Sequence, residues 1–282
     1  MAPENMHSFW NNTISNVYGS FCAGLSGMQK YCELGEVTFL GRKLPNYKSE
    51  IQQRLYLLRY FSAYLFEYVE AFSLLAKSGF ITKPAKIVSL GSGSGIDGMA
   101  ARFALPACSY LGIDLVKWSD WFPHESPQIM NAAEFIPAAQ DVFVFPKSLN
   151  EFSDDVVLAL ADNLPKTSAS KICIINSRRS DTATDGEKCT KLLQAFGSTH
   201  DNTTCLKVHP NGMRFNAYYN WFFYPPHILN SVAGLSALCP NSIDSWPNNC
   251  IYGNEWCDHS AMNKSPILWD KFFCTQIYLI QR

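Results

Sequence analysis

The chain has 282 residues, of which 47% are apolar and 14% aromatic, and its formal net charge is -1. This composition excludes a disordered chain and allows one large α/β domain with a substantial core. A net charge near zero gives no overall basic field, so a nucleic acid would have to bind a local basic patch.

The sequence shows no signal of export or membrane insertion. The N-terminus lacks a basic segment followed by an apolar run, and no stretch of about 18 apolar residues occurs. The ten cysteines follow no regular framework, and several lie in apolar runs such as the one around Cys173. These patterns predict a cytoplasmic protein with reduced thiols and no membrane partner.

The first eighty residues differ from the rest of the chain. Residues 49–77 contain no Pro or Gly, and their apolar residues recur at helical spacing, which predicts a long amphipathic helix. Four tyrosines fall every four residues along it: Tyr56, Tyr60, Tyr64 and Tyr68. Such a ridge either lies over a ligand site or packs against the sheet, and packing is favoured because aromatic stripes usually belong to the core. We expect residues 1–80 to form a helical extension or cap, and residues 81–282 to form the main domain.

From residue 86 onward, predicted strands and helices alternate, which is typical of a mostly parallel, doubly wound α/β sheet. The predicted strands are 86–90, 108–114, about 129–135, 141–145, 171–176, 215–224 and 272–280. The predicted helices are 97–103, 154–164 and 185–196. A loop insertion is expected at about 234–266, where Asn, Pro, Ser and Gly are frequent.

A glycine-rich loop follows the first predicted strand. Its glycines are Gly91, Gly93 and Gly95, and Asp114 ends the next strand. Glycines let the backbone turn sharply and approach a ligand closely, and an acid at the second strand can accept hydrogen bonds from both hydroxyls of a ribose. The pairing predicts a nucleoside-cofactor site.

This order of motifs resembles the class I S-adenosylmethionine-dependent methyltransferases. Residues 87–95 fit the family's first motif, apolar-apolar-x-apolar-Gly-x-Gly-x-Gly, except that most members carry an acid where this chain has Ser89. The resemblance implies a seven-stranded Rossmann-like fold, S-adenosylmethionine as cofactor, and in-line methyl transfer that depends mainly on positioning. It assigns the following residues to cofactor binding: Gly91, Ser92, Gly93, Gly95, Asp114, Phe145 and, by a loose match, Glu134.

The family's fourth motif corresponds to residues 145–152, where Lys147 and Glu151 are the candidate catalytic residues. Lys147 is expected to steer an anionic acceptor, and Glu151 to act as a general base or bind a cationic one. The ordinary alternatives are a solvated loop charge and a carboxylate that suits a helix dipole. The segment lacks the motifs of nucleic-acid amino- and cytosine-methyltransferases, so a small-molecule or protein acceptor is favoured over a nucleic acid.

Two other functions and a metal site match parts of the sequence less well. Residues 93–98 formally match Gly-x-Gly-x-x-Gly of NAD(P)-dependent oxidoreductases, but alignment on Gly91 puts Ile96 at the third glycine. A catalytically inactive binding module is favoured by Ser89 and disfavoured by the intact glycines. The late group Cys239, Cys250, Cys257 and His259 matches no zinc-binding spacing, so no metal is predicted.

Overall fold

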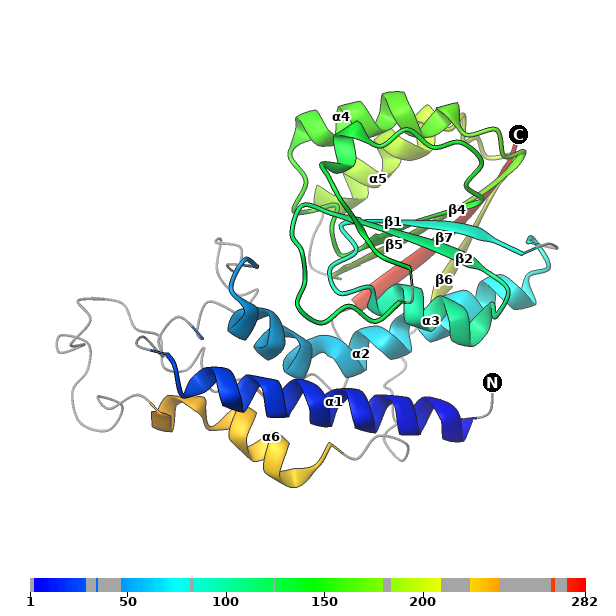
Figure 1. Cartoon of the computed structure of the whole chain (residues 1–282). Helices are drawn as coiled ribbons and strands as arrows, with labels where there is room; N and C mark the ends of the chain where they lie inside the picture. The colour runs from blue at the N-terminus through cyan, green and yellow to red at the C-terminus, as the bar shows by residue number, and fades with distance from the viewer. Residues whose placement is uncertain are drawn as a thin grey trace.

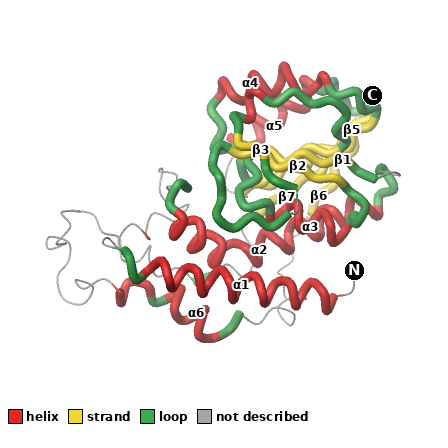
Figure 2. Tube along the Cα trace, in the orientation of Figure 1, coloured by secondary structure: helices red, strands yellow, loops and turns green. Residues whose placement is uncertain are grey.

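The structure is a computed structural model that describes residues 3–28, 34, 47–81, 84–123, 125–179, 184–208, 224–238, 265–266 and 273–282. A β-sheet forms the middle layer of the fold, and helices cover both of its faces (Figure 1). Figure 2 shows the strands together between the two helical layers. The predicted α/β fold is confirmed.

Among the described residues the sheet has seven strands, in the order β3-β2-β1-β4-β5-β7-β6. The first five strands run parallel, whereas β7 is antiparallel to both β5 and β6. The strands are β1 (Lys86–Leu90), β2 (Ser109–Asp114), β3 (Gln128–Ile129), β4 (Val142–Pro146), β5 (Lys171–Arg179), β6 (Thr203–Val208) and β7 (Phe273–Gln281). The strand order changes direction between β1 and β4, so the carboxyl ends of these strands flank the switch point where open α/β sheets bind ligands.

The helices form two unequal layers. On one face lie α4 (Asp154–Asn163) and α5 (Thr184–Ala195), and on the other lie α2 (Glu50–Lys77) and α3 (Ile96–Ala104) (Figure 1). Beyond α2, a further layer contains α1 and α6, with bounds Pro3–Leu25 and Pro226–Ala233. Short 3-10 turns span Ala132–Glu134 (η2), Leu164–Lys166 (η3) and Leu235–Leu238 (η5).

The two faces of the sheet carry separate apolar clusters because successive side chains of a strand point to opposite faces. Ile87 of β1 and Val144 of β4 pack toward α2 and α3, while Val88 and Phe143 pack toward α4 and α5. Strand β1 is buried at all but its first residue. This burial on both faces explains why the parallel strands read as continuous apolar runs.

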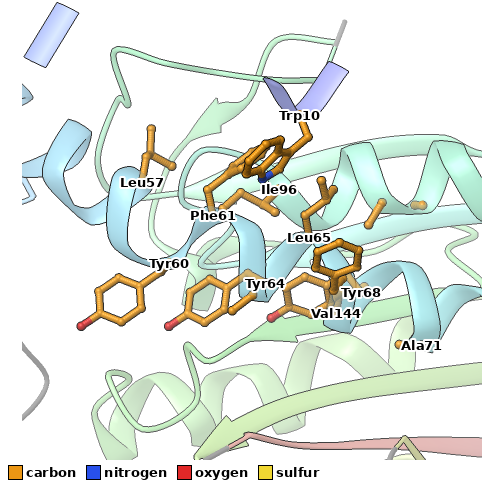
Figure 3. Packing of buried hydrophobic residues seen from close by; sticks show 14 of the residues in the cluster. Trp10, Leu57, Tyr60, Phe61, Tyr64, Leu65, Tyr68, Ala71, Ile96 and Val144 are labelled. Atoms are coloured by element: carbon orange, nitrogen blue, oxygen red, sulfur yellow. The ribbon is translucent and has the colours of Figure 1, made fainter. Parts of the chain in front are cut away.

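The predicted helix at residues 49–77 is confirmed as α2, which is buried on almost all sides because it lies between the sheet and α1. Tyr60, Tyr64 and Tyr68 are 5%, 5% and 1% exposed, so the packing interpretation of the tyrosine ridge is confirmed for these three. Figure 3 shows them in a row along one side of α2, with Phe61 and Leu65 on the side that meets Trp10 and Ile96.

Two of the predicted strands, the third and the one at residues 215–224, are not found as expected among the described residues. The third was expected over about 129–135, but β3 covers only Gln128–Ile129 and η2 follows. The side chain of Asn131 accepts a hydrogen bond from the N–H of Ala133, at 3.0 Å, and so begins a turn where a strand was predicted. The late strand 215–224 lies outside the described residues except for Tyr224, which is not in a strand. Strand β6 was not predicted.

The division of the chain at about residue 80 stays a prediction. The expected insertion at about 234–266 lies mostly outside the described residues. None of the described helices is long and apolar enough to cross a membrane.

Candidate functional site

The glycine loop lies at the carboxyl end of β1, next to the switch point of the sheet. Gly91, Gly93 and Gly95 have φ angles of 74°, 56° and 76°, a region that other residues rarely adopt. A Cβ atom at Gly91 would lie 2.5 Å from Cβ of Ser148, and one at Gly95 would lie 2.5 Å from Cδ of Pro123. The glycines are therefore required by backbone conformation at all three positions and by space at two.

The end of β2 holds this loop in place. The N–H groups of Gly91 and Ser92 both donate to the carbonyl of Ile113, at 2.8 and 3.0 Å. The Asp114 carboxylate accepts from the N–H of Gly93 and from that of Val116, each at 2.8 Å. A carboxylate offers about four acceptor positions, so Asp114 retains capacity for a pair of hydroxyl donors.

Burial raises the pKa of the Asp114 carboxyl, and the N–H groups of Val116 and Gly93 lower it in part. The residue therefore combines two properties, because it fixes the loop and presents a partly desolvated acceptor beside it.

Polar atoms without partners mark the loop as a place for a ligand. The side chains of Ser92 and Ser94 are 5% and 2% exposed, yet neither hydroxyl has a hydrogen-bond partner among the residues that the structure describes. Buried hydroxyls are normally satisfied, so each orphan points to a missing water or ligand group. The loop has polar groups, close backbone approach and a neighbouring carboxylate, a combination that fits a nucleoside cofactor without phosphate.

The segment after β2 covers the loop, which the sequence did not predict. The Trp118 ring lies 3.5 Å from the position of a Cβ at Gly93, and Trp121 lies 3.1 Å from the equivalent position at Gly95. Gln53 of α2 fastens this segment, since its side chain donates to the carbonyl of Lys117 at 3.2 Å and accepts from the N–H of Ser119 at 2.8 Å. The N-terminal part of α2 therefore helps to form the wall of the site.

Lys147 lies at the end of β4 and is buried, so its interpretation as a solvated loop charge is wrong. Its ammonium lies 2.6 Å from a carboxylate oxygen of Glu67 on α2 and also donates to the hydroxyl of Ser177 on β5. The hydroxyls of Ser177 and Thr275 both donate to the other carboxylate oxygen of Glu67. The Tyr64 ring completes the surroundings, with its centroid 4.8 Å from the ammonium.

Four elements therefore converge on one compensated charge pair: α2, β4, β5 and β7. Glu67 was missed by sequence reasoning, although a signal existed, because a carboxylate inside the aromatic stripe of a buried helix needs a partner. The role of Lys147 toward an anionic acceptor stays a prediction.

Glu151 lies half-buried in the turn between β4 and α4. The hydroxyl of Tyr47 donates to its carboxylate at 3.4 Å. Burial raises the pKa of the Tyr47 phenol, with smaller contributions from Tyr56 and Glu151. Ser153, not Glu151, caps α4 through the N–H of Val156. The predicted acid–base role of Glu151 also stays a prediction.

The side chains of Phe145 and Glu134, the other two residues predicted to bind the cofactor, do not belong to the glycine loop. Phe145 is fully buried and its ring belongs to the cluster under α4 and α5, so only its backbone faces the switch point. Glu134 is exposed at the end of η2. Their assignments to cofactor binding stay predictions.

The group of late cysteines and a histidine that was considered as a zinc site cannot be placed in the structure. Cys239, Cys250, Cys257 and His259 are outside the described residues. Within the part of the chain that the structure describes, no three His, Cys, Asp or Glu side chains are grouped to hold a metal.

The strand order, the antiparallel β7 and the glycine loop at the switch point form the seven-stranded Rossmann-like fold that the sequence resemblance implies. Comparison with protein-family models and with curated proteins gives no match.

Solved structures with a similar arrangement include the plantazolicin methyltransferase BpumL in complex with SAH, which is 11% identical with a TM-score of 0.44, over 96% of this chain and 99% of that one. Another is a Burkholderia thailandensis 1,6-didemethyltoxoflavin-N1-methyltransferase, 10% identical over 76% of this chain and 79% of that one, with a TM-score of 0.40. A third is a TehB-like SAM-dependent methyltransferase from Corynebacterium glutamicum, 8% identical over 75% and 88% of the two chains, with a TM-score of 0.36. At such identities a likeness concerns the fold alone.

Proposed function

We propose that this protein is an S-adenosylmethionine-dependent methyltransferase that acts on a small molecule or a protein side chain. One observation carries the proposal: three left-handed glycines at the carboxyl end of β1 face a carboxylate at the end of β2, with Gly93 N and Asp114 Oδ2 2.8 Å apart. This arrangement suits a ligand that has a ribose and needs close backbone approach.

The cofactor, when bound, supplies an electrophilic methyl group on a sulfonium. Gly91, Ser92, Gly93 and Gly95 would hold its amino-acid part, and Asp114 would bind its ribose. Glu134 and the Phe145 backbone are proposed to border the adenine and the reacting centre. Trp118 would exclude water from the loop, because its ring lies against Gly93.

The acceptor would lie at the end of β4, where the chain offers positioning and no covalent catalyst. Lys147 and Glu67 compensate each other there, and the rings of Tyr64 and Tyr68 lie 4.8 and 5.9 Å from the ammonium. A compensated, aromatic surrounding favours a compact acceptor over a nucleic-acid backbone, which needs uncompensated cations. We assign Lys147 to orienting the acceptor and Glu151 to accepting a proton from it, since in-line transfer depends mainly on alignment.

The first test is calorimetric titration with S-adenosylmethionine, S-adenosylhomocysteine and NADH, followed by a screen of acceptors with labelled methyl donor. Both sulfur ligands are expected to bind with micromolar affinity and NADH is expected not to bind. Binding of NADH alone would favour the oxidoreductase, and binding without transfer to any acceptor would favour the inactive module. Failure of both sulfur ligands to bind would overturn the proposal.

A pair of glycine variants links binding to the loop. Gly93→Ala places a Cβ at ordinary contact distance from Trp118, so it changes the backbone preference and leaves the packing. Gly197→Ala is its matched control, because Gly197 has a φ of 73° and open space around its Cβ position. Both variants should lose about 1 kcal/mol of stability, but only Gly93→Ala should weaken cofactor binding, by roughly tenfold or more.

Asp114→Ala is less informative. The Asp114 carboxylate also holds the N–H groups of Gly93 and Val116, so its removal disturbs the loop together with any ribose contact.

A further inference from the structure

Strand β1 has no acidic residue at the position where most members of the resembled methyltransferase family have one. Ser89 occupies this position in the present chain. Ser89 is fully buried and its side chain points to the face covered by α2 and α3, the face that Ile87 also occupies. Its hydroxyl has no hydrogen-bond partner of good geometry. The strand end therefore cannot by itself anchor the glycine loop through a charge.

A buried carboxylate lies opposite this serine, on the first turn of α3. Asp97 is 1% exposed, and one of its oxygens accepts a hydrogen bond from the Tyr110 hydroxyl of β2, at 2.9 Å. Burial raises the pKa of the Asp97 carboxyl to about 6, and the nearby Ser89 hydroxyl lowers it in part. The second oxygen of the carboxylate has no hydrogen-bond partner of good geometry among the described residues.

Asp97 also serves the start of α3. The N-cap of this helix is Gly95, which offers no side-chain cap, so the first N–H groups need another acceptor. The Asp97 carboxyl interacts with its own N–H and with that of Gly98, and these N–H groups offset part of the rise in pKa that burial causes. A negative charge here is also favoured by the helix dipole.

These contacts bracket the glycine loop. Ser89 lies two residues before the loop and Asp97 lies two residues after it, and the hydrogen bond from Tyr110 to Asp97 joins the start of α3 to the neighbouring strand β2. The titratable groups that face it are Tyr110 from β2 and Tyr68 from α2, and both phenols have pKa values raised by burial.

We propose that Asp97 is a positioning residue that supplies, from the first turn of α3, the acid that the resembled family carries at the position of Ser89. Through Tyr110 the carboxylate ties the start of α3 to β2, the strand whose Ile113 carbonyl and Asp114 carboxylate hold the loop, and it thereby keeps the loop in the conformation that binds the cofactor. This inference rests on the proposed function only for the identity of the bound ligand, S-adenosylmethionine.

The test moves the acid back to the strand. Cofactor affinity is measured for wild type, Asp97→Ser and the double variant Ser89→Asp/Asp97→Ser. The single variant should bind roughly tenfold more weakly, because a hydrogen-bonded charge is lost, and the double variant should recover most of that loss. Equal affinity of wild type and Asp97→Ser, or no recovery in the double variant, would overturn the proposal.

A pH profile separates positioning from a purely structural effect. Wild-type affinity should rise as pH increases through about 6, where the buried carboxyl ionises, whereas Asp97→Asn should lack this step. Asp141→Asn is the matched control: Asp141 is also buried, at the other end of β1, and its carboxylate accepts from the N–H of Lys86 at 3.1 Å. It should lower stability and leave both affinity and the pH step unchanged. A step that persists in Asp97→Asn would count against the proposal.

Hydrogen exchange without ligand keeps the inference independent of the cofactor. Amides of residues 91–95 should exchange faster in Asp97→Ser than in wild type and slow again in the double variant. If the wild type binds neither sulfur ligand, the proposed function fails while this exchange result still decides whether Asp97 positions the loop. Unchanged exchange in Asp97→Ser would overturn it.

Discussion

The ammonium of Lys147 lies 2.6 Å from the carboxylate of Glu67, a residue 80 positions earlier in the chain. The two side chains are 9% and 2% exposed, so the pair is isolated from solvent. It fastens the middle of α2 to the end of β4. The same turn carries Ser148, whose hydroxyl donates to the carbonyl of Leu90 at 2.5 Å and whose Cβ packs against Gly91. Helix α2 is thus linked to the glycine loop.

Removing one member of this pair should be strongly destabilising. Glu67→Gln leaves a buried ammonium uncompensated and should lower the free energy of unfolding by about 3–5 kcal/mol. The double variant Glu67→Gln/Lys147→Met should recover much of this loss, because no unpaired charge remains. Urea unfolding of the four proteins of this cycle measures the coupling.

The control for this cycle is Glu50→Gln, which breaks an exposed pair with Arg54 on the same helix. Its effect should stay below about 1 kcal/mol. If Glu67→Gln were equally mild, the buried pair would not hold α2 to the sheet.

The backbone at Lys147 gives a second prediction. Among the described residues other than glycine, Lys147 alone has a positive φ angle, 62°. Lys147→Ala and Lys147→Gly both remove the ion pair, but only glycine removes the left-handed strain. Lys147→Gly should therefore be more stable than Lys147→Ala by about 1 kcal/mol in thermal or urea unfolding. Equal stabilities would mean that the turn relaxes once the ammonium is gone.

Gln53 should influence the cofactor through the segment that covers the loop. Its side chain donates to the carbonyls of Tyr47 and Lys117 and accepts from the N–H of Ser119. Gln53→Ala should remove these hydrogen bonds, lower stability by about 1–3 kcal/mol and speed cofactor release. Stopped-flow measurement of the dissociation rate tests this, with Lys77→Ala at the exposed end of α2 as control. An unchanged release rate would show that residues 116–123 do not depend on α2.

Asp97 predicts a pH dependence of stability. Burial raises the pKa of its carboxyl from 3.8 to about 6, so between these values the folded state binds more protons than the unfolded state. The contribution of Asp97 to stability is therefore complete below pH 4 and is lost as pH rises to 6, by about 3 kcal/mol.

The difference in unfolding free energy between wild type and Asp97→Asn isolates this contribution from other titrations. Measured by urea unfolding from pH 4 to 7.5, Asp97→Asn should gain on wild type as pH rises through the window. A constant difference would mean that the Asp97 carboxyl keeps its ordinary pKa in the folded protein.

Much of the fold was predictable because its signals are local. The periodicity of residues 49–77 predicted α2, since a helix needs only its own apolar spacing. The apolar run before Gly91 and the three glycines predicted β1, the loop and the start of α3, since left-handed positions at a strand end require glycine. Asp114 followed from the end of the next strand in the same way. Strand β6 was missed because five of its six residues are half-buried or exposed in the sequence Thr-Thr-Cys-Leu-Lys-Val, at the edge of the sheet, and this run has no clear apolar pattern.

By itself, then, the sequence determined the α/β class, the glycine loop with Asp114 and the buried helix, because each depends on residues near one another in the chain. Only the tertiary structure decided that β7 lies antiparallel between β5 and β6, that Trp118 packs on Gly93, that Asp97 faces Ser89 and that Glu67 meets Lys147. These relationships join segments that are separated in the sequence or brought together by a turn, and no periodicity records them. They arise from packing and from the need to pair buried polar groups, which act only once the chain has folded.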